Sequence, residues 1–447
     1  MEYCLAIDVG ASSGQCLLGA RDKLDKNKIE TEEIYRFNNV PIQFNGKICW
    51  DSIKIFYHIL SGMKRCAGAG KTPVSIGINS WGVDFVLLDS NGKILGNAVS
   101  YRDDRTIGMA EKVHEIVPEL EHYSRTGINK YLFNTIYQLM AIKLKEPELL
   151  ENAESLLFIT DYINYKLCGV LACEYTMATT SGLVNVETGD WDDEIIDRLG
   201  FPRKIFLPLS KRGTVLGTLT TDIQDQVGFD SKIVLPPAHD TACAFYSVTD
   251  EKNIILSSGT WSIIGVKIPK PILTKEAHDC GFTNEGASDG KVRFLKNIMG
   301  LWMIQQVKKE LGGKFSYIEL IGMAEESNYD GLVDVNENCF FAPKSMITTI
   351  EEKCTEGGFP APQTTGDLIL CICRSLAKAY AKTISNLTDL TGQKFEAITI
   401  IGGGSKNDLL NKLTEQECGL PVKPGYAESS ALGNLMSQLN CHCEELK

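Results

Sequence analysis

One stretch near the start of the chain decides the fold: Asp8-Val9-Gly10-Ala11-Ser12-Ser13-Gly14-Gln15. Apolar residues alternate over 3–9 and recur over 15–20, which predicts two strands joined by a glycine-rich turn. Backbone N–H groups in such a turn can converge on a phosphate, and the hydroxyls add donors. Neither a Walker A lysine nor a following helix is present, so the stretch is not a P-loop or a dinucleotide fingerprint. An ordinary tight hairpin explains this stretch alone equally well.

The same pattern returns in the second half. Residues 253–266 predict a strand, the turn Ser258-Gly259-Thr260, and another strand. Two such hairpins indicate an internal duplication, with each half a sheet flanked by helices. If they face each other across a cleft, they can hold one triphosphate from both sides. We therefore predict an α/β protein with one domain over 1–245 and another over 246–447.

Composition and charge limit the class of protein to which this chain can belong. A chain of 447 residues is too long for one ordinary core, and 43% hydrophobic with 23% charged residues is typical of globular proteins. The net charge of −12 argues against nucleic-acid binding. The sequence shows no membrane-spanning run and no signal peptide, so we expect a cytoplasmic protein. We also expect a monomer or a small homo-oligomer. We expect the 15 cysteines to be reduced; a Cys354–Cys371 bridge is the alternative.

A carboxylate follows an apolar segment at His239-Asp240-Thr241. Phosphoryl transfer to a hydroxyl needs a group that accepts the proton, and an aspartate at the start of a helix suits that role. The alternative is that Asp240 is only a helix cap.

Two further segments are typical of ligand contacts. Trp81 beside Gly82 can cover the apolar face of a sugar, although core packing is equally consistent. The glycines 402–404 follow a buried strand and leave room for adenine or ribose, unless they form a plain strand-to-helix connection. Residues 101–105 either line the sugar pocket or form a solvated charge cluster, which we favour. The pattern over 106–170 predicts mostly helix.

Together these motifs resemble the FGGY carbohydrate kinase family of the actin/hexokinase-like superfamily, from Ala6 to about Leu439. The resemblance implies two actin-like (ribonuclease H-like) domains with a cleft between them. The motifs that carry it are Asp8–Gly14, Ile78–Asp89, Tyr101–Asp103, Phe133–Thr135, His239–Ala242, Ser257–Ser262, Lys296–Trp302 and Gly402–Gly404.

The resemblance also implies roles for individual residues. Asp240 is the expected general base, and the expected sugar contacts are Gly82, His239 and Thr241, with Trp81 beside them. The expected ATP contacts are Ala11, Ser12, Ser13, Gly14, Gln15, Thr260, Asn297, Gln305 and Gly403, and Asp8 is expected to attend Mg²⁺ through water. Gln15 stands where relatives usually carry arginine, and Asn79 where they often carry aspartate.

Within the family, the first loop and the Trp81 block are most similar to the members that act on L-rhamnulose. This implies transfer of the γ-phosphoryl group of MgATP to the 1-hydroxyl of L-rhamnulose. Two alternatives stay open: a kinase for another ketose such as L-fuculose or L-xylulose, and an actin-like ATPase switch.

Overall fold

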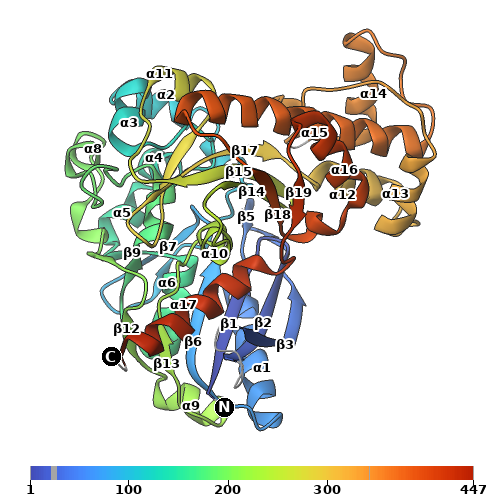
Figure 1. Cartoon of the computed structure of the whole chain (residues 1–447). Coiled ribbons are helices and arrows are strands. Elements are labelled where there is room, and N and C mark those ends of the chain that lie inside the picture. The colour runs from blue at the N-terminus through green and yellow to red at the C-terminus, as the bar shows by residue number, and fades with distance from the viewer. Residues whose placement is uncertain (1, 22–27, 342, 446–447) are drawn as a thin grey trace.

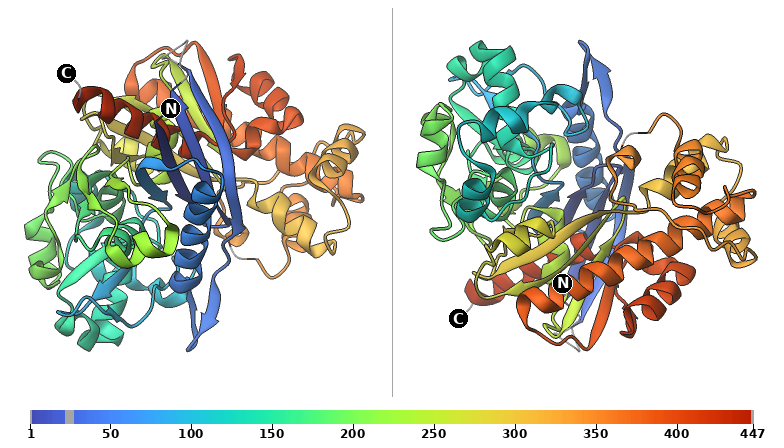
Figure 2. Two further views of the ribbon diagram at one scale, coloured as in Figure 1. Left: turned by 90° about the horizontal axis from the view of Figure 1, so that it is seen from below. Right: turned by 90° about the horizontal axis from the view of Figure 1, so that it is seen from above.

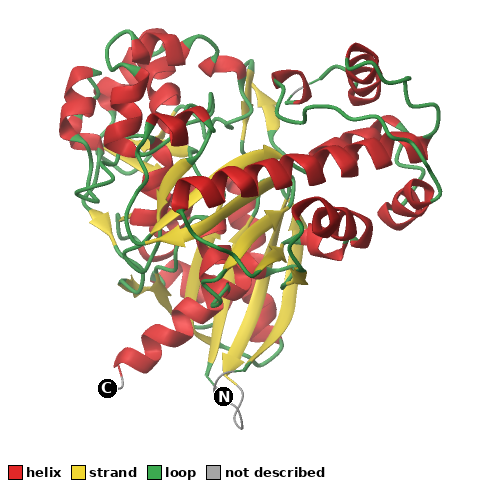
Figure 3. Ribbon diagram, turned by 45° about the horizontal axis from the view of Figure 1, so that its top comes forward, coloured by secondary structure: helices red, strands yellow, loops and turns green. Residues whose placement is uncertain are grey.

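The computed structural model describes residues 2–21, 28–341 and 343–445, and in this part of the chain it contains two six-stranded mixed sheets covered by helices (Figures 1 and 3). The two-part α/β architecture predicted from the sequence is therefore confirmed.

The first sheet is built around the predicted hairpin. Its order is β12-β13-β6-β1-β2-β3, with β1 antiparallel to β2 and parallel to β6. The strands are β1 Tyr3–Val9, β2 Ser13–Arg21, β3 Ile29–Asn38, β6 Pro73–Ser80, β12 Val215–Thr218 and β13 Lys232–Val234. β1 is buried on both faces because helices cover both sides of the sheet.

The second sheet repeats this arrangement in the order β16-β17-β15-β14-β18-β19. β14 is antiparallel to β15 and parallel to β18, just as β1 pairs with β2 and β6. The strands are β14 Asn253–Ser258, β15 Trp261–Ile268, β16 Thr283–Gly286, β17 Val292–Met299, β18 Ala397–Ile401 and β19 Val422–Pro424. The two halves therefore share one topology, as the duplicated hairpin indicated.

The segment 106–170 is mostly helical, as predicted, but it also contains a strand. β9 (Ser155–Phe158) pairs with β7 (Phe85–Leu88), which also pairs with β8 (Ile94–Leu95). The remaining short strands are β4 Ile42–Phe44, β5 Lys47–Cys49, β10 Cys173–Glu174 and β11 Leu209–Ser210. The apolar part of β9 is a run of only three residues, 156–158, which fits either periodicity, so its pattern does not separate strand from helix.

Helices α1 to α9 belong to the first half. They are α1 Ser52–Gly68, α2 Met109–His114, α3 Glu119–Thr126, α4 Thr135–Lys145, α5 Pro147–Asn152, α6 Ile159–Cys168, α7 Tyr175–Ala178, α8 Asp193–Arg198 and α9 Thr221–Val227. α10 (Asp240–Ser247) packs against both β6 and β14, so it lies between the two sheets.

The later helices are α11 Lys275–Asp279, α12 Trp302–Glu310, α13 Tyr317–Glu325, α14 Met346–Glu356, α15 Thr365–Thr391, α16 Asp408–Cys418 and α17 Ser429–Glu445. The longest of these helices is α15; the Thr364 side chain caps its start, and it ends at Gly392, where φ is 65°. α12, α13 and α14 project to one side of the molecule (Figures 1 and 2).

α17 returns to the first sheet, although it follows the second in sequence (Figure 1). Asn434 Nδ2 donates to the Gly77 carbonyl at 3.0 Å, and Gln438 Nε2 donates to the Leu5 carbonyl at 3.1 Å. The division between 1–245 and 246–447 stays a prediction, and α17 contacts the sheet on the other side of it. Within the described residues, no helix combines the length and apolar character needed to cross a membrane.

Candidate active site

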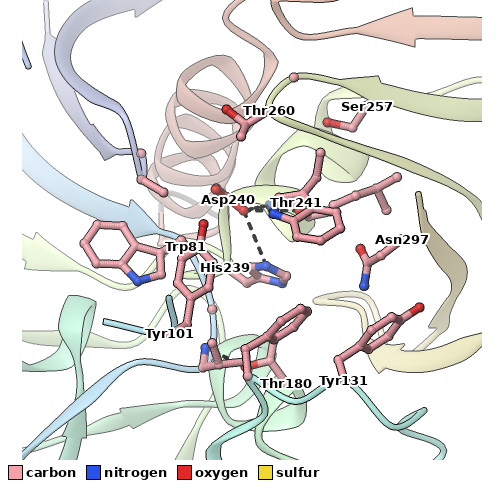
Figure 4. Close-up of a pocket in the computed structure, with 18 of the residues that line it drawn as sticks. Trp81, Tyr101, Tyr131, Thr180, His239, Asp240, Thr241, Ser257, Thr260 and Asn297 are labelled. Carbon is pink, nitrogen blue, oxygen red and sulfur yellow. Dashed lines mark hydrogen bonds and ion pairs between the residues drawn. The ribbon is translucent and has the colours of Figure 1, made fainter. Parts of the chain in front are cut away.

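A cavity of about 320 Å³ opens where the two sheets meet, in the size range of small-molecule sites. Both hairpin turns and the start of α10 contribute to it (Figure 4). It is lined by Gly10, Ala11, Ser12, Ser13, Trp81, Gly82, Val83, Tyr101, Ile128, Tyr131, Phe133, Asn134, Thr180, His239, Asp240, Thr241, Ser257, Gly259, Thr260, Trp261, Ile263, Thr283, Glu285, Asn297 and Ser430.

The first hairpin turn is held tightly. Gly10 N donates to the Ser13 carbonyl at 2.9 Å, and Asn39 Nδ2 donates to the Gly10 carbonyl at 2.9 Å. Ala11, Ser12 and Ser13 are therefore presented to the cavity by a rigid turn. Gly14 has a different role: a Cβ there would lie 2.1 Å from the Phe37 ring, so packing requires glycine.

The second hairpin turn lies against the glycines 402–404. Gly402 has a φ of 83°, and a Cβ on Gly404 would lie 2.0 Å from Ser258 Oγ. A Cβ on Gly403 would meet no atom within 4 Å. Two of the three glycines are thus explained by close packing against Ser258, and Gly403 alone borders open space.

The end of the first sheet determines the position of Asp240. Ser80 N donates to the Ala238 carbonyl at 2.9 Å, and the chain then turns into α10. His239, not Asp240, is the N-cap residue of α10, so the cap interpretation is wrong. Asp240 Oδ1 accepts from Thr241 N at 2.6 Å and Thr241 Oγ1 at 3.1 Å, whereas no described residue donates to Oδ2.

The segment from Trp81 to Asp84 combines strain with burial. Val83 has a φ of 68°, which is costly for a β-branched residue and is a feature that clusters at functional sites. Its N–H donates to Thr180 Oγ1, and its carbonyl accepts from Thr135 Oγ1. Asp84 Oδ2 accepts from the Trp81 indole at 2.9 Å. Trp81 therefore both packs in the core and lines the cavity.

The segment 101–105 is mostly buried, so the favoured interpretation as a solvated cluster is wrong. Tyr101 lines the cavity, and Asp103 and Arg105 are buried. Arg102 lies over the rings of both Tyr101 and Trp302. The sequence of 101–105 is typical of an exposed charged cluster, because the residues that bury it lie far away in the chain.

Three carboxylates gather behind the first turn. Burial raises the pKa of Asp8 to about 7, and the nearby Asp240 and Glu428 carboxylates add to this rise. Asp8 accepts from Asn79 Nδ2 at 2.6 Å and from Gln15 Nε2 at 3.2 Å. Both Asp8 oxygens therefore already have donors.

Gln15 also has a charged neighbour. Arg36 lies opposite Gln15 across β2 and β3, and its Nη2 donates to Gln15 Oε1 at 2.9 Å. A guanidinium on the neighbouring strand therefore contacts Gln15, and Glu33 and Glu428 pair with it.

The comparisons with known proteins agree with this geometry. The N-terminal domain of the FGGY family of carbohydrate kinases matches residues 3–246, and the C-terminal domain matches 254–440. The chain belongs to the FGGY family of carbohydrate kinases. It is 43% identical over 441 residues to a rhamnulokinase of Oceanobacillus iheyensis, covering 98% of this chain and 93% of the relative. It is 38% identical over 437 residues to a rhamnulokinase of Bacteroides thetaiotaomicron, covering 97% of this chain and 89% of the relative.

Solved structures of a xylulose kinase and a glycerol kinase share the fold. A xylulose kinase from Lactobacillus acidophilus superposes with a TM-score of 0.82 at 18% identity, covering 99% of this chain and 90% of that one. A glycerol kinase from Plasmodium falciparum, solved with ADP, gives 0.75 at 15% identity, covering 98% and 89%. At these identities the likeness concerns the fold.

The cavity gathers most of the residues that the sequence singled out. It brings together Asp240, Gly82, Trp81, His239, Thr241, Ala11, Ser12, Ser13, Thr260 and Asn297. Asp8, Gly14, Gln15, Gln305 and Gly403 are not among its lining residues. Their roles toward ATP and Mg²⁺ stay predictions.

Several lining residues were missed, among them Tyr131, Thr180 and Glu285. Thr180 lies in a one-turn 3-10 helix, Thr179–Ser181, that carries no motif, and its hydroxyl matters because it accepts from the Val83 N–H. Glu285 lies on β16, where it meets His239 through tertiary structure alone. No local pattern in the sequence marks these positions.

Proposed function

We propose that this chain transfers the γ-phosphoryl group of ATP to the 1-hydroxyl of L-rhamnulose. The observation that carries the proposal is the position of Asp240, in a cavity shared by two phosphate-type turns. Relatives at 38–43% identity over nearly the whole chain that are named rhamnulokinase support the substrate.

In this mechanism Asp240 accepts the proton of the attacking hydroxyl. Thr241 occupies Oδ1, which leaves Oδ2 for the substrate. The turns at 10–13 and 258–260 donate to the phosphoryl oxygens, whose charge is the main target of catalysis in phosphoryl transfer. Trp81 and Tyr101 close one side of the sugar site and exclude water (Figure 4).

In the part of the chain that the structure describes, no three His, Cys, Asp or Glu side chains form a group that could hold a metal ion directly, so magnesium would be held through water. Repulsion between Asp8, Asp240 and Glu428 is what a divalent cation relieves, and Asp8, with both oxygens hydrogen-bonded, suits contact through water. When bound, Mg²⁺ supplies charge neutralisation on the phosphates. The use of ATP further supports a cytoplasmic location, and we expect a monomer or a small homo-oligomer.

A coupled ADP-release assay tests the proposal. MgATP is offered with L-rhamnulose, L-fuculose, L-xylulose, D-xylulose and glycerol, and with no sugar. We expect the highest kcat/KM with L-rhamnulose. Preference for another ketose would reassign the substrate, and ADP release independent of every sugar would favour an ATPase switch.

A further inference from the structure

A row of ionisable side chains crosses from the second half of the molecule to the proposed base. His239 Nε2 lies 3.4 Å from Asp240 Oδ1, and His239 Nδ1 lies 3.3 Å from Glu285 Oε2. Arg293 Nη1 lies 3.0 Å from the same Glu285 oxygen. His239 and Asp240 follow the first sheet, whereas Glu285 and Arg293 lie on β16 and β17 of the second.

The Glu285–Arg293 pair is built into the second sheet. The two residues are direct partners across β16 and β17, and Arg293 Nε donates to the Gly286 carbonyl at 3.0 Å. Arg293 has no exposed surface, and its Nη1 donates to His239 Nδ1 at 3.3 Å. Among the described residues, Arg293 Nη2 and Glu285 Oε2 meet no partner with hydrogen-bond geometry. Burial by itself raises the pKa of Glu285, but Arg293 and His239 outweigh it and hold that pKa below its usual value. Glu285 is therefore an ionised carboxylate held in one place.

Stability alone does not account for this pair. A buried ion pair is often no more stabilising than apolar residues of the same size. Glu285 also lines the cavity and faces the His239 ring. In a histidine ring, the hydrogen bond made by one nitrogen determines whether the other nitrogen donates or accepts.

We propose that Glu285 is a positioning residue for the sugar: its carboxylate holds Arg293, whose Nη1 donates to His239 Nδ1 at 3.3 Å, so that His239 Nε2 is the ring N–H that faces a sugar hydroxyl beside Asp240. This inference rests on the proposed function. It also means that the sugar site is complete only when the two halves of the molecule are together, since each supplies part of the row.

The test compares Glu285→Gln and Glu285→Asp with the wild-type enzyme. The control is Glu396→Gln, because Glu396 forms only an exposed pair with Lys252 in the same half. We expect Glu285→Gln to lower kcat/KM for the ketose about 10- to 100-fold, as loss of an orienting partner does. The KM for ATP should stay within about threefold, Glu285→Asp should recover part of the loss, and Glu396→Gln should match the wild type.

A His239→Gln/Glu285→Gln double variant separates the possible roles. If Glu285 acts through His239, the double variant is no worse than His239→Gln alone. Additive losses would mean that Glu285 meets the sugar directly and would overturn the positioning role. Equal losses toward ATP and ketose, with no recovery in Glu285→Asp, would reduce the pair to a structural one. A wild-type enzyme inactive on every ketose would instead refute the proposed function before any variant is compared.

Discussion

Replacing Asp240 by asparagine isolates the proton-accepting role of this residue. Oδ1 accepts from the Thr241 backbone at 2.6 Å and from its hydroxyl at 3.1 Å, and an amide oxygen accepts both bonds equally well. The variant should therefore fold and keep the shape of the cavity. What changes is Oδ2, which becomes an NH₂ group that cannot take a proton. General-base catalysis contributes about 10²- to 10⁴-fold, or about 2.7–5.4 kcal/mol of barrier.

The assay is steady-state ADP release at saturating ATP and ketose. We expect kcat to fall at least about 100-fold while the KM for ATP stays within about threefold. Asp389→Asn, an exposed position on α15, is the matched control and should behave as the wild type. Turnover of Asp240→Asn within about threefold of the wild-type rate would remove Asp240 from the mechanism.

Three further predictions concern two glycines, a buried aspartate and two cysteines. Gly14→Ala should lower the free energy of unfolding by about 1–3 kcal/mol, measured with denaturant, because its Cβ would overlap the Phe37 ring. Gly403→Ala should fold normally and raise the KM for ATP, and equal stability of the two variants would contradict the packing role of Gly14. Burial raises the pKa of Asp161 well above its usual value near 4, so the native state holds a proton that the unfolded chain releases, and stability falls as pH rises. The melting temperature of Asp161→Asn should therefore exceed that of the wild type by more at pH 7.5 than at pH 5. A difference that does not change with pH would speak against this prediction. The Cys354 and Cys371 sulfurs lie 3.6 Å apart as free thiols, so thiol titration of the denatured protein without reductant should find all 15 cysteines, and 13 would reveal a bridge.

The sequence predicted the parts of the fold that local patterns encode. Both hairpins combine two short apolar strands with a glycine-containing turn, and this combination needs no tertiary information. β9 is a serine followed by three apolar residues between helices, and only its pairing with β7 makes it a strand. The return of α17 to the first sheet follows no local rule, because its hydrogen bonds reach residues more than 350 positions earlier.

The candidate site likewise contains residues that local sequence patterns predicted and residues that they did not predict. Asp240 and Thr260 were predicted because each follows a strand within a recognisable motif, and both line the cavity. Glu285 and Arg293 were missed because a glutamate and an arginine eight residues apart have no distinctive pattern. Their meaning comes from the β16–β17 register and from the approach of His239, which belongs to the other half.

The position of α17 has a consequence for synthesis on the ribosome. Cys4, Ala6 and Leu17 of the first sheet are buried against Ala431, Leu435 and Leu439 of this helix. These residues lie on β1 and β2, which are translated by Arg21, and roughly 410 further residues must be translated before α17 begins at Ser429. At about 5–20 residues per second, this apolar strip waits for roughly 20–80 s. During that time a nascent chain offers it to chaperones or to neighbouring chains, so slow translation of the second half should favour aggregation of the first.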